Sequence, residues 1–146
     1  MKDYTVGAAC ALVNREYGPN GGITIYLSQR KGPYETGKYS FPGGMVDSTD
    51  KTVRDVMVRE LKEETGLDIQ FWRVVNAELD SWHIGGKSDL TKWFIVELMQ
   101  NEVPMNTEPH KHSDWVKYTL NDAYKLPLMV STKDILNKLS LRYKNQ

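Results

Sequence analysis

The segment from Gly43 to Leu67, GGMVDSTDKTVRDVMVRELKEETGL, constrains the fold of this chain more than any other. It joins a pair of glycines to an acidic loop and then to one helix. Pro42 fixes a backbone torsion ahead of the glycines, which adopt conformations closed to other residues. The segment therefore predicts a bend at which the backbone closely approaches another group.

The helix is predicted over residues 51–65. Asp50 and Thr52 are both candidate N-caps, and Asp55 lies three residues after Thr52 as in an imperfect capping box. Gly66 stands where a helix C-terminus favours a left-handed residue. Both ends of the helix are thus marked in the local sequence.

Glu60, Glu63 and Glu64 share one face of this helix, because a rotation of about 100° per residue keeps them within an arc of about 100°. Apolar residues overlap or adjoin that arc: Val53, Val56, Met57 and Leu61. The other charged residues are predicted on the opposite side: Arg59, Lys62 and Asp55.

Like charges beside apolar surface repel one another and lose hydration, so this cluster of glutamates requires a cation. Mg²⁺ or Mn²⁺ suits carboxylate oxygens. An E-x-x-E-E pattern alone is more typical of a solvated helix. The glycine pair before it and the Gly-Leu after it favour a metal site.

Residues 59–67, RELKEETGL, resemble the second half of the Nudix box, R-E-U-x-E-E-x-G-U, in which U is aliphatic. The match over this half is complete. The preceding residues 41–44, FPGG, resemble the lead-in to the box. The combination is highly specific for the Nudix family.

The first half of the box departs from the family pattern. The family usually places a glutamate six positions after the second glycine and seven residues before the arginine. Counting from Gly44 reaches Asp50, and residues 51–58 then separate it from Arg59. The loop has one extra residue, and the resemblance assigns the role of that glutamate to Asp50 or Asp47.

The resemblance implies an α/β fold, a Nudix-type α/β/α sandwich with a mixed sheet between helices. It implies that Glu60, Glu63 and Glu64 bind the metal, together with the backbone carbonyl of Gly43. Glu60 or Glu63 is then the catalytic base. Structural or orienting roles fall to Arg59, Gly44 and Asp50.

The implied reaction is hydrolysis of a nucleoside diphosphate linked to another moiety. The segments after the box resemble MutT-like pyrophosphatases at Glu108-Pro109, Trp115 and Leu126-Pro127. We therefore favour a nucleoside triphosphate, cleaved to a nucleoside monophosphate and pyrophosphate. Dinucleoside polyphosphates, ADP-ribose and dinucleotide cofactors remain alternatives. A nucleotide sensor without turnover is a further alternative, which the retained glutamates disfavour.

Several other residues are candidates for contact with the substrate. Arg30 and Lys31 are suited to phosphate, although each also fits a solvated loop. Candidates for stacking on a base are Tyr34, Trp115 and Trp82. Candidates for an additional metal ligand or base in the downstream loop are Glu108 and Asp114.

The length of 146 residues predicts a single domain over residues 1–146. Nineteen basic residues balance nineteen acidic ones, so no global field favours nucleic acid or membrane as a partner. We expect a small-molecule nucleotide as the ligand and leave monomer and homodimer open. Cys10 is the only cysteine, which favours a reducing compartment, the cytoplasm.

The remaining elements follow from hydrophobic patterning and turn residues. A strand at 4–13 is predicted to be covered on both faces and to form a hairpin with a strand at 23–29. Further strands are predicted at 68–80, 92–99 and 115–118, with a flexible connection at 81–89 and a long loop at 100–114. A helical turn at 120–127 precedes a C-terminal helix with a capping box at Ser131 and Asp134.

Overall fold

A computed structural model describes residues 4–16, 21–84 and 88–144. Its elements in chain order are β1 (Tyr4–Arg15), β2 (Ile23–Gln29), β3 (Tyr39–Ser40), β4 (Gly43–Met45), α1 (Val53–Thr65), the 3-10 helix η1 (Phe71–Arg73), β5 (Val75–Ile84), β6 (Ser88–Glu97), β7 (Val116–Thr119), α2 (Leu120–Ala123) and α3 (Val130–Arg142). The seven-stranded sheet has the order β3-β2-β1-β6-β5, with β4 paired to β1 and β7 paired to β2.

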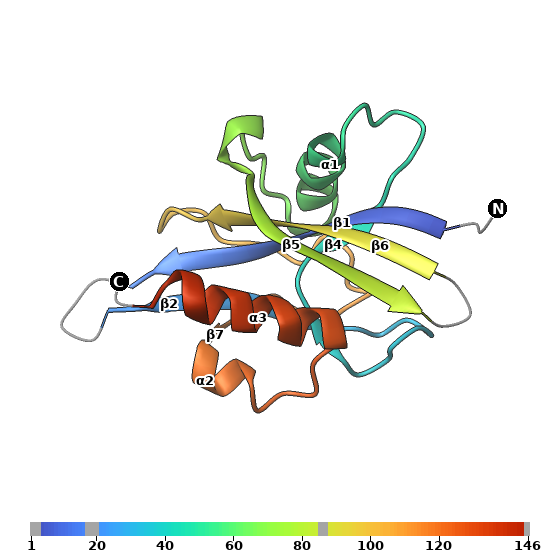
Figure 1. Cartoon of the computed structure of the whole chain (residues 1–146). Coiled ribbons are helices and arrows are strands. Elements are labelled where there is room, and N and C mark those ends of the chain that lie inside the picture. Colours follow the sequence, from blue (N-terminus) through green and yellow to red (C-terminus); the bar gives the residue numbers. More distant parts are fainter. Residues whose placement is uncertain (1–3, 17–20, 85–87, 145–146) are drawn as a thin grey trace.

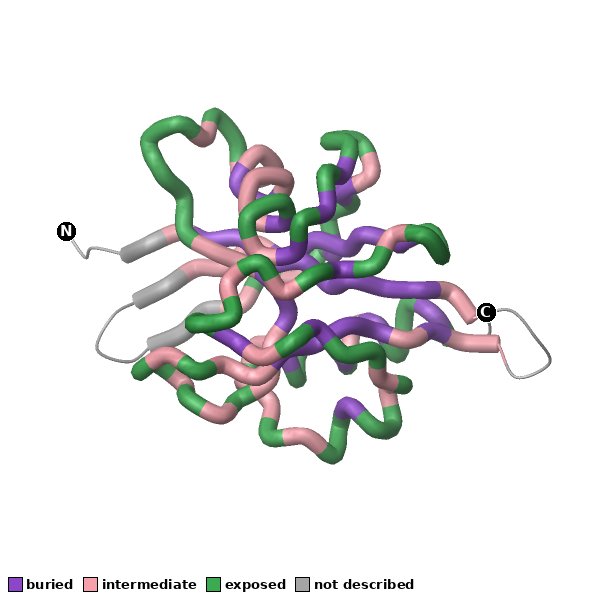
Figure 2. The backbone as a smooth tube through the Cα atoms, turned by 180° about the vertical axis from the view of Figure 1, so that it is seen from behind, coloured by how far each residue is buried: buried purple, intermediate pink, exposed green. Residues whose placement is uncertain are grey.

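Strand β1 is the centre of the sheet. It runs parallel to β6 and antiparallel to β2 and β4. Its residues 8–13 are buried (Figure 2) and alternate between two cores. Both the hairpin with β2 and the coverage of β1 on two faces are therefore confirmed.

Helices cover both faces of the sheet, as Figure 1 shows for α1 on one side and α3 on the other. The core under α1 contains Val56, Met57 and Leu61 together with alternate residues of β1. The core under α3 contains Ile135, Leu136, Leu139 and Tyr143. This arrangement confirms the predicted α/β/α sandwich with a mixed sheet.

The segment predicted as a flexible connection, 81–89, is mostly strand. Strand β5 continues to Ile84 and pairs antiparallel with β6, which begins at Ser88. The register shifts between Asn76 and Asp80. The local composition favours a loop, but pairing with β6 holds these residues in a strand. Residues 85–87 lie outside the described part of the chain.

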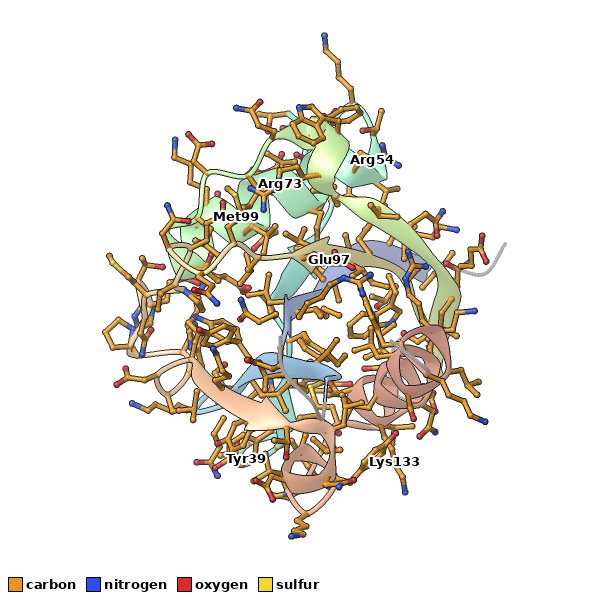
Figure 3. All side chains as sticks on the ribbon, turned by 90° about the vertical axis from the view of Figure 1, so that its left-hand side faces the viewer. Tyr39, Arg54, Arg73, Glu97, Met99 and Lys133 are labelled. Atoms are coloured by element: carbon orange, nitrogen blue, oxygen red, sulfur yellow. The ribbon has the colours of Figure 1, made fainter. Side chains whose placement is uncertain are left out.

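The strand predicted from residue 68 begins only at Val75, because η1 precedes it. Arg73 holds η1 against the end of β6 (Figure 3). Its guanidinium forms an ion pair with Glu102 at 2.6 Å and donates a hydrogen bond to the carbonyl of Glu97 at 3.0 Å. These contacts replace the predicted extended backbone with a short helical turn.

The capping box predicted at Ser131 is wrong. Helix α3 begins at Val130, so Ser131 lies inside its first turn, and the N-cap residue, Met129, makes no capping hydrogen bond through its side chain. The helical spacing of the buried residues is confirmed. In the described part of the chain, no helix combines the length and apolar composition needed to cross a bilayer.

Helix α1 begins at Val53, two residues later than predicted; of its candidate N-caps Thr52 is confirmed and Asp50 is not, and Gly66 is confirmed as the C-cap. Thr52 Oγ1 accepts a hydrogen bond from the backbone N–H of Asp55 at 3.1 Å, and Asp55 Oδ2 accepts one from the N–H of Thr52 at 3.0 Å. Gly66 ends the helix with a φ of 73°. The caps fix where along the chain α1 presents its glutamates.

Thr52→Ala is expected to lower the free energy of unfolding by about 1 kcal/mol, because the amide of Asp55 loses its capping acceptor. Urea denaturation measures this loss. Thr52→Ser keeps the hydroxyl and is the matched control. Equal destabilisation by both substitutions would show that the capping hydrogen bond is unimportant.

Candidate active site

The glycine pair lies between β1 and α1. Gly43 pairs with Ala9, and Gly44 with Ala8. A Cβ atom on Gly43 would lie 2.6 Å from the carbonyl oxygen of Ala8, and one on Gly44 would lie 2.6 Å from Glu60 Oε2. The predicted close approach of backbone is thus present on two sides, to a strand and to a carboxyl group.

Glu64 is held at this bend by the backbone. The N–H of Gly43 donates a hydrogen bond to Glu64 Oε2 at 2.9 Å. Burial raises the pKa of Glu64 to about 8, although the hydrogen bond from Gly43 opposes the rise. The negative charges of Glu60 and Glu108 add to it. Near neutral pH this carboxyl group therefore requires a proton or a cation.

Glu60 lies beside it and is similarly desolvated. Its side chain is 13% exposed, and burial raises its pKa in spite of the neighbouring Arg59. The carboxyl group of Glu63 is 52% exposed at the rim. The three predicted glutamates thus comprise two sheltered carboxyl groups and one that water reaches.

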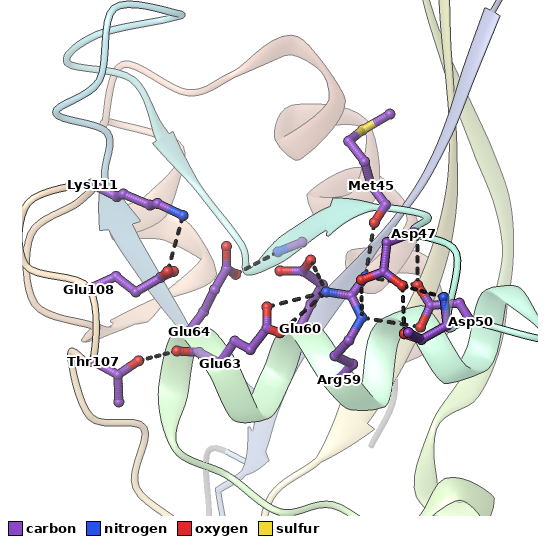
Figure 4. A network of polar contacts seen from close by, with 12 residues as sticks. Met45, Asp47, Asp50, Arg59, Glu60, Glu63, Glu64, Thr107, Glu108 and Lys111 are labelled. Atoms are coloured by element: carbon purple, nitrogen blue, oxygen red, sulfur yellow. Dashed lines mark hydrogen bonds and ion pairs between the residues drawn. The ribbon is translucent and has the colours of Figure 1, made fainter.

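Arg59 connects the acidic loop to the glutamates (Figure 4). Its guanidinium binds both oxygens of Asp50 at 3.1 and 2.8 Å. It also forms ion pairs with Glu60 at 2.8 Å and Glu63 at 3.2 Å. The prediction that Arg59 lies on the opposite side from the glutamates is wrong, because its long side chain reaches back to them.

Asp50 and Asp47 are the two candidates for the role of the first box glutamate, and Asp50 is the more closely held. Its side chain is 4% exposed, and the hydrogen bond from Arg59 lowers its pKa. Asp47 is more exposed and lies 3.4 Å from Arg59 Nε. The first half of the box is therefore coupled to the second through Arg59.

The downstream loop docks on the C-terminal end of α1. Trp115 Nε1 donates a hydrogen bond to the carbonyl of Glu64 at 3.1 Å. The backbone N–H of Met105 donates one to the carbonyl of Thr65 at 2.9 Å. The hydroxyl of Thr107 donates to the carbonyl of Glu63. These bonds satisfy carbonyl groups that a helix end leaves without partners.

This docking brings Glu108 and Lys111 in front of the glutamates (Figure 4). Glu108 Oε2 lies 3.0 Å from Lys111 Nζ. The sequence predicts Glu108 as a candidate but not Lys111. The i,i+3 spacing of the two residues was the available signal, but it is common on protein surfaces.

Other predicted residues lie at the rim or in the core. Arg30 Nε donates to the carbonyl of Tyr34 at 3.0 Å and lies over its ring, and Lys31 Nζ donates to the carbonyl of Pro109 at 3.0 Å. Trp115 is buried, 8% exposed, within the core under α1.

Asp114 accepts a hydrogen bond from Asn106 at 3.2 Å. Among the described contacts, none joins it to the glutamates. The side chain of Trp82 lies outside the described part of the structure.

The donor chemistry of the site fits a divalent ion, since the desolvated carboxyl groups of Glu60 and Glu64 lie together beside the glycine pair. Among the described residues, no three carboxyl, imidazole or thiol groups are already arranged as a coordination shell. Arg59 holds Glu60 and Glu63 in this arrangement. In the described part of the chain, Arg59 is thus the side chain that neutralises Glu60 and Glu63.

Comparison with known proteins assigns the family. A sequence model described as the NUDIX domain matches residues 3–139. The fold is similar to a MutT NUDIX hydrolase from Burkholderia pseudomallei, with a TM-score of 0.76 and 24% identity over 94% of this chain and 98% of that one. It is also similar to a C. elegans Ap4A hydrolase, with a TM-score of 0.74 and 22% identity over 94% and 96% of the two chains.

The NUDIX domain of Shewanella oneidensis NrtR, complexed with ADP ribose, has a TM-score of 0.76 and 17% identity over 97% of this chain and 90% of that one. These structures share the fold.

A curated relative, the U8 snoRNA-decapping enzyme of Ovis aries, is 36% identical over 66 residues. The match covers 45% of this chain and 34% of the relative, about a third of its length. The family match, by contrast, extends over nearly the whole chain and includes the box and the sheet that supports it. This chain therefore belongs to the Nudix hydrolase family, whose members generally use divalent metal ions.

Proposed function

We propose that this protein is a pyrophosphohydrolase that uses Mg²⁺ or Mn²⁺ to hydrolyse a nucleoside diphosphate linked to another moiety. The observation that carries the proposal is the pair of sheltered carboxyl groups, Glu60 and Glu64, against the Gly43–Gly44 backbone. Carboxylates that are desolvated to this degree are unfavourable without a counter-ion, and a hard cation stabilises them. Such a cation would also attract the negatively charged diphosphate of a substrate.

Each residue of the box has a role in this proposal. A divalent ion held by these residues would supply positive charge to the diphosphate and so favour attack of water on its phosphorus. Glu60, Glu63 and Glu64 would hold the ion, and the N–H of Gly43 keeps Glu64 in place. Between Glu60 and Glu63 as base, Glu63 is better placed to accept the proton of the attacking water, because its carboxylate is 52% exposed.

Arg59 orients two of these glutamates and is itself fixed by Asp50. Glu108 contributes a further carboxylate from the downstream loop, as metal ligand or base. Arg30 and Lys31 contact phosphate oxygens at the rim, and Tyr34, exposed to 49%, offers its ring to a base. Burial of Trp115 leaves it a structural role at the end of α1.

The favoured substrate is a nucleoside triphosphate, which yields a nucleoside monophosphate and pyrophosphate. Similarity to a MutT NUDIX hydrolase over 94% of this chain supports that choice. Similarity to the Ap4A hydrolase supports dinucleoside polyphosphates as the alternative substrate. Burial of Cys10 as a free thiol is compatible with the cytoplasm as the proposed location.

Turnover of a panel of nucleotides with Mg²⁺ tests the proposal. The panel contains nucleoside triphosphates, Ap4A, ADP-ribose and NAD, and chromatography identifies the products. We expect release of a nucleoside monophosphate, which EDTA abolishes and Mn²⁺ restores. Tight, metal-independent binding of a nucleotide without turnover of any compound would instead identify a sensor.

A further inference from the structure

Lys111 is a cation positioned opposite the glutamates of α1, and the roles assigned above leave it unused. Its ammonium pairs with Glu108 at 3.0 Å, and the two side chains are 60% and 20% exposed, respectively. The pKa of Lys111 is raised by Glu108 first, and the charges of Glu64 and Glu60 also contribute. Figure 4 shows this pair in front of the glutamates of α1, so Lys111 lies beside the carboxyl groups that would hold a metal.

The backbone that carries Lys111 is fixed, whereas its side chain is not. The carbonyl of Lys111 accepts a hydrogen bond from the N–H of Lys31, and its N–H donates to the carbonyl of Glu108, both at 2.9 Å. Lys31 Nζ additionally binds the carbonyl of Pro109. A lysine side chain has a flexible four-carbon stem, so its ammonium can change partners while the loop stays in place.

Carboxyl groups outnumber cations in this network (Figure 4). Arg59 is committed to Asp50, Glu60 and Glu63. Lys111 neutralises Glu108, the acidic side chain that the downstream loop brings in front of the glutamates of α1. Glu108, a potential ligand of a divalent ion, is already paired with the ammonium group of Lys111. A divalent ion that binds Glu108 would be repelled by this ammonium group, because two cations on one carboxylate repel each other strongly.

We propose that Lys111 is an exchangeable counter-ion: it pairs with Glu108 while the site lacks a metal, and it moves to a phosphate oxygen of the substrate when the divalent ion binds Glu108. This inference rests on the proposed function. It assigns Lys111 two measurable effects of opposite sign. Lys111 weakens binding of the metal alone, and it strengthens binding of the nucleotide.

The first experiment measures Mn²⁺ affinity by electron paramagnetic resonance without any nucleotide. Lys111→Met is expected to bind Mn²⁺ about 3- to 10-fold more tightly than the wild type, because Glu108 no longer has a competing partner. In a Glu108→Gln background the same substitution should have less than about a twofold effect. This cycle separates exchange at Glu108 from a general change in charge.

The second experiment measures steady-state turnover of the nucleotide identified in the panel. Lys111→Met is expected to raise KM about tenfold with kcat changed less than about threefold, and Lys111→Arg to restore KM. Lys125→Met is the matched control, since Lys125 follows α2 and forms an i,i+3 ion pair at 3.5 Å with Asp122 of that helix. It should leave both Mn²⁺ affinity and KM unchanged.

Two results would overturn the inference alone, given a wild type that binds Mn²⁺ and turns over nucleotide. One is weaker or unchanged Mn²⁺ binding by Lys111→Met, and the other is an equal effect of that substitution in both Glu108 backgrounds. A wild type that neither binds Mn²⁺ nor hydrolyses any nucleotide would overturn the proposed function, and the inference with it.

Discussion

Replacing Glu64 with glutamine is expected to lower kcat/KM by about 10³-fold, because one of the sheltered metal ligands loses its charge. The same substitution is expected to stabilise the metal-free protein at pH 8. Glutamine keeps the size of the side chain and a carbonyl oxygen that accepts the hydrogen bond from Gly43. Activity and stability therefore change in opposite directions.

The sign of the stability effect follows from the pKa. Burial raises the pKa of Glu64 from its ordinary 4.5 to about 8 in the folded protein. A raised folded-state pKa gives a contribution to stability that is complete below pH 4.5 and is lost as the pH rises through 8. The difference between Glu64→Gln and the wild type should thus grow over this range, reaching on the order of 1–3 kcal/mol.

Thermal and urea unfolding in EDTA at pH 5 and pH 8 measure the effect on stability. Mg²⁺ should restore the stability of the wild type at pH 8, since binding stabilises the folded state by mass action. Glu63→Gln is the control: we expect a similar loss of turnover but no gain in stability, because Glu63 is 52% exposed. Full activity of Glu63→Gln would rule out the proposed catalytic metal site.

Gly44→Ala is expected to lower kcat/KM by about 10²-fold while the protein still folds. The added Cβ would collide with the carboxyl group of Glu60. That group is the far end of a flexible side chain, so it moves away and the backbone keeps its position. The expected cost is therefore in metal binding, with the melting temperature lowered by less than about 4 °C.

Gly43→Ala provides the contrast to Gly44→Ala. Its Cβ would lie 2.6 Å from the backbone oxygen of Ala8 and 3.0 Å from Ala9. Because backbone cannot rotate away, β1 and β4 must separate, and we expect a loss of about 2–4 kcal/mol in the free energy of unfolding. Turnover with variable Mg²⁺, together with urea unfolding of both variants, tests this contrast. Wild-type metal dependence in Gly44→Ala would contradict the proposed role of the Gly44 contact.

Helix α1 was predictable because its signals are local. Thr52 and Asp55 cap each other, and Gly66 adopts the left-handed conformation that its position requires. The continuous apolar sequence of β1 likewise anticipates a strand between two layers. These elements need little information from distant parts of the chain.

The errors concern contacts between distant segments. Strand β5 extends to Ile84 because β6 pairs with it, although the local residues favour a loop. Arg59 reaches the glutamates because Asp50 and the carbonyl of Met45 hold the far side of its guanidinium. Lys111 enters the site because Trp115 docks the downstream loop on α1. A helical projection or a spacing rule uses only neighbouring residues, so it cannot predict contacts with these distant residues.

The parallel pairing of β1 with β6 has a consequence for how the chain folds. Residues 84 positions apart, such as Val13 and Glu97, are direct neighbours in the sheet. Closing so long a segment costs chain entropy before the contacts form, and topologies of this kind fold slowly. The central strand is synthesised before its parallel partner, so a nascent chain that ends before β6 carries an apolar strand with one edge unpaired. Such an incomplete chain is prone to aggregation until residues 88–97 have been synthesised.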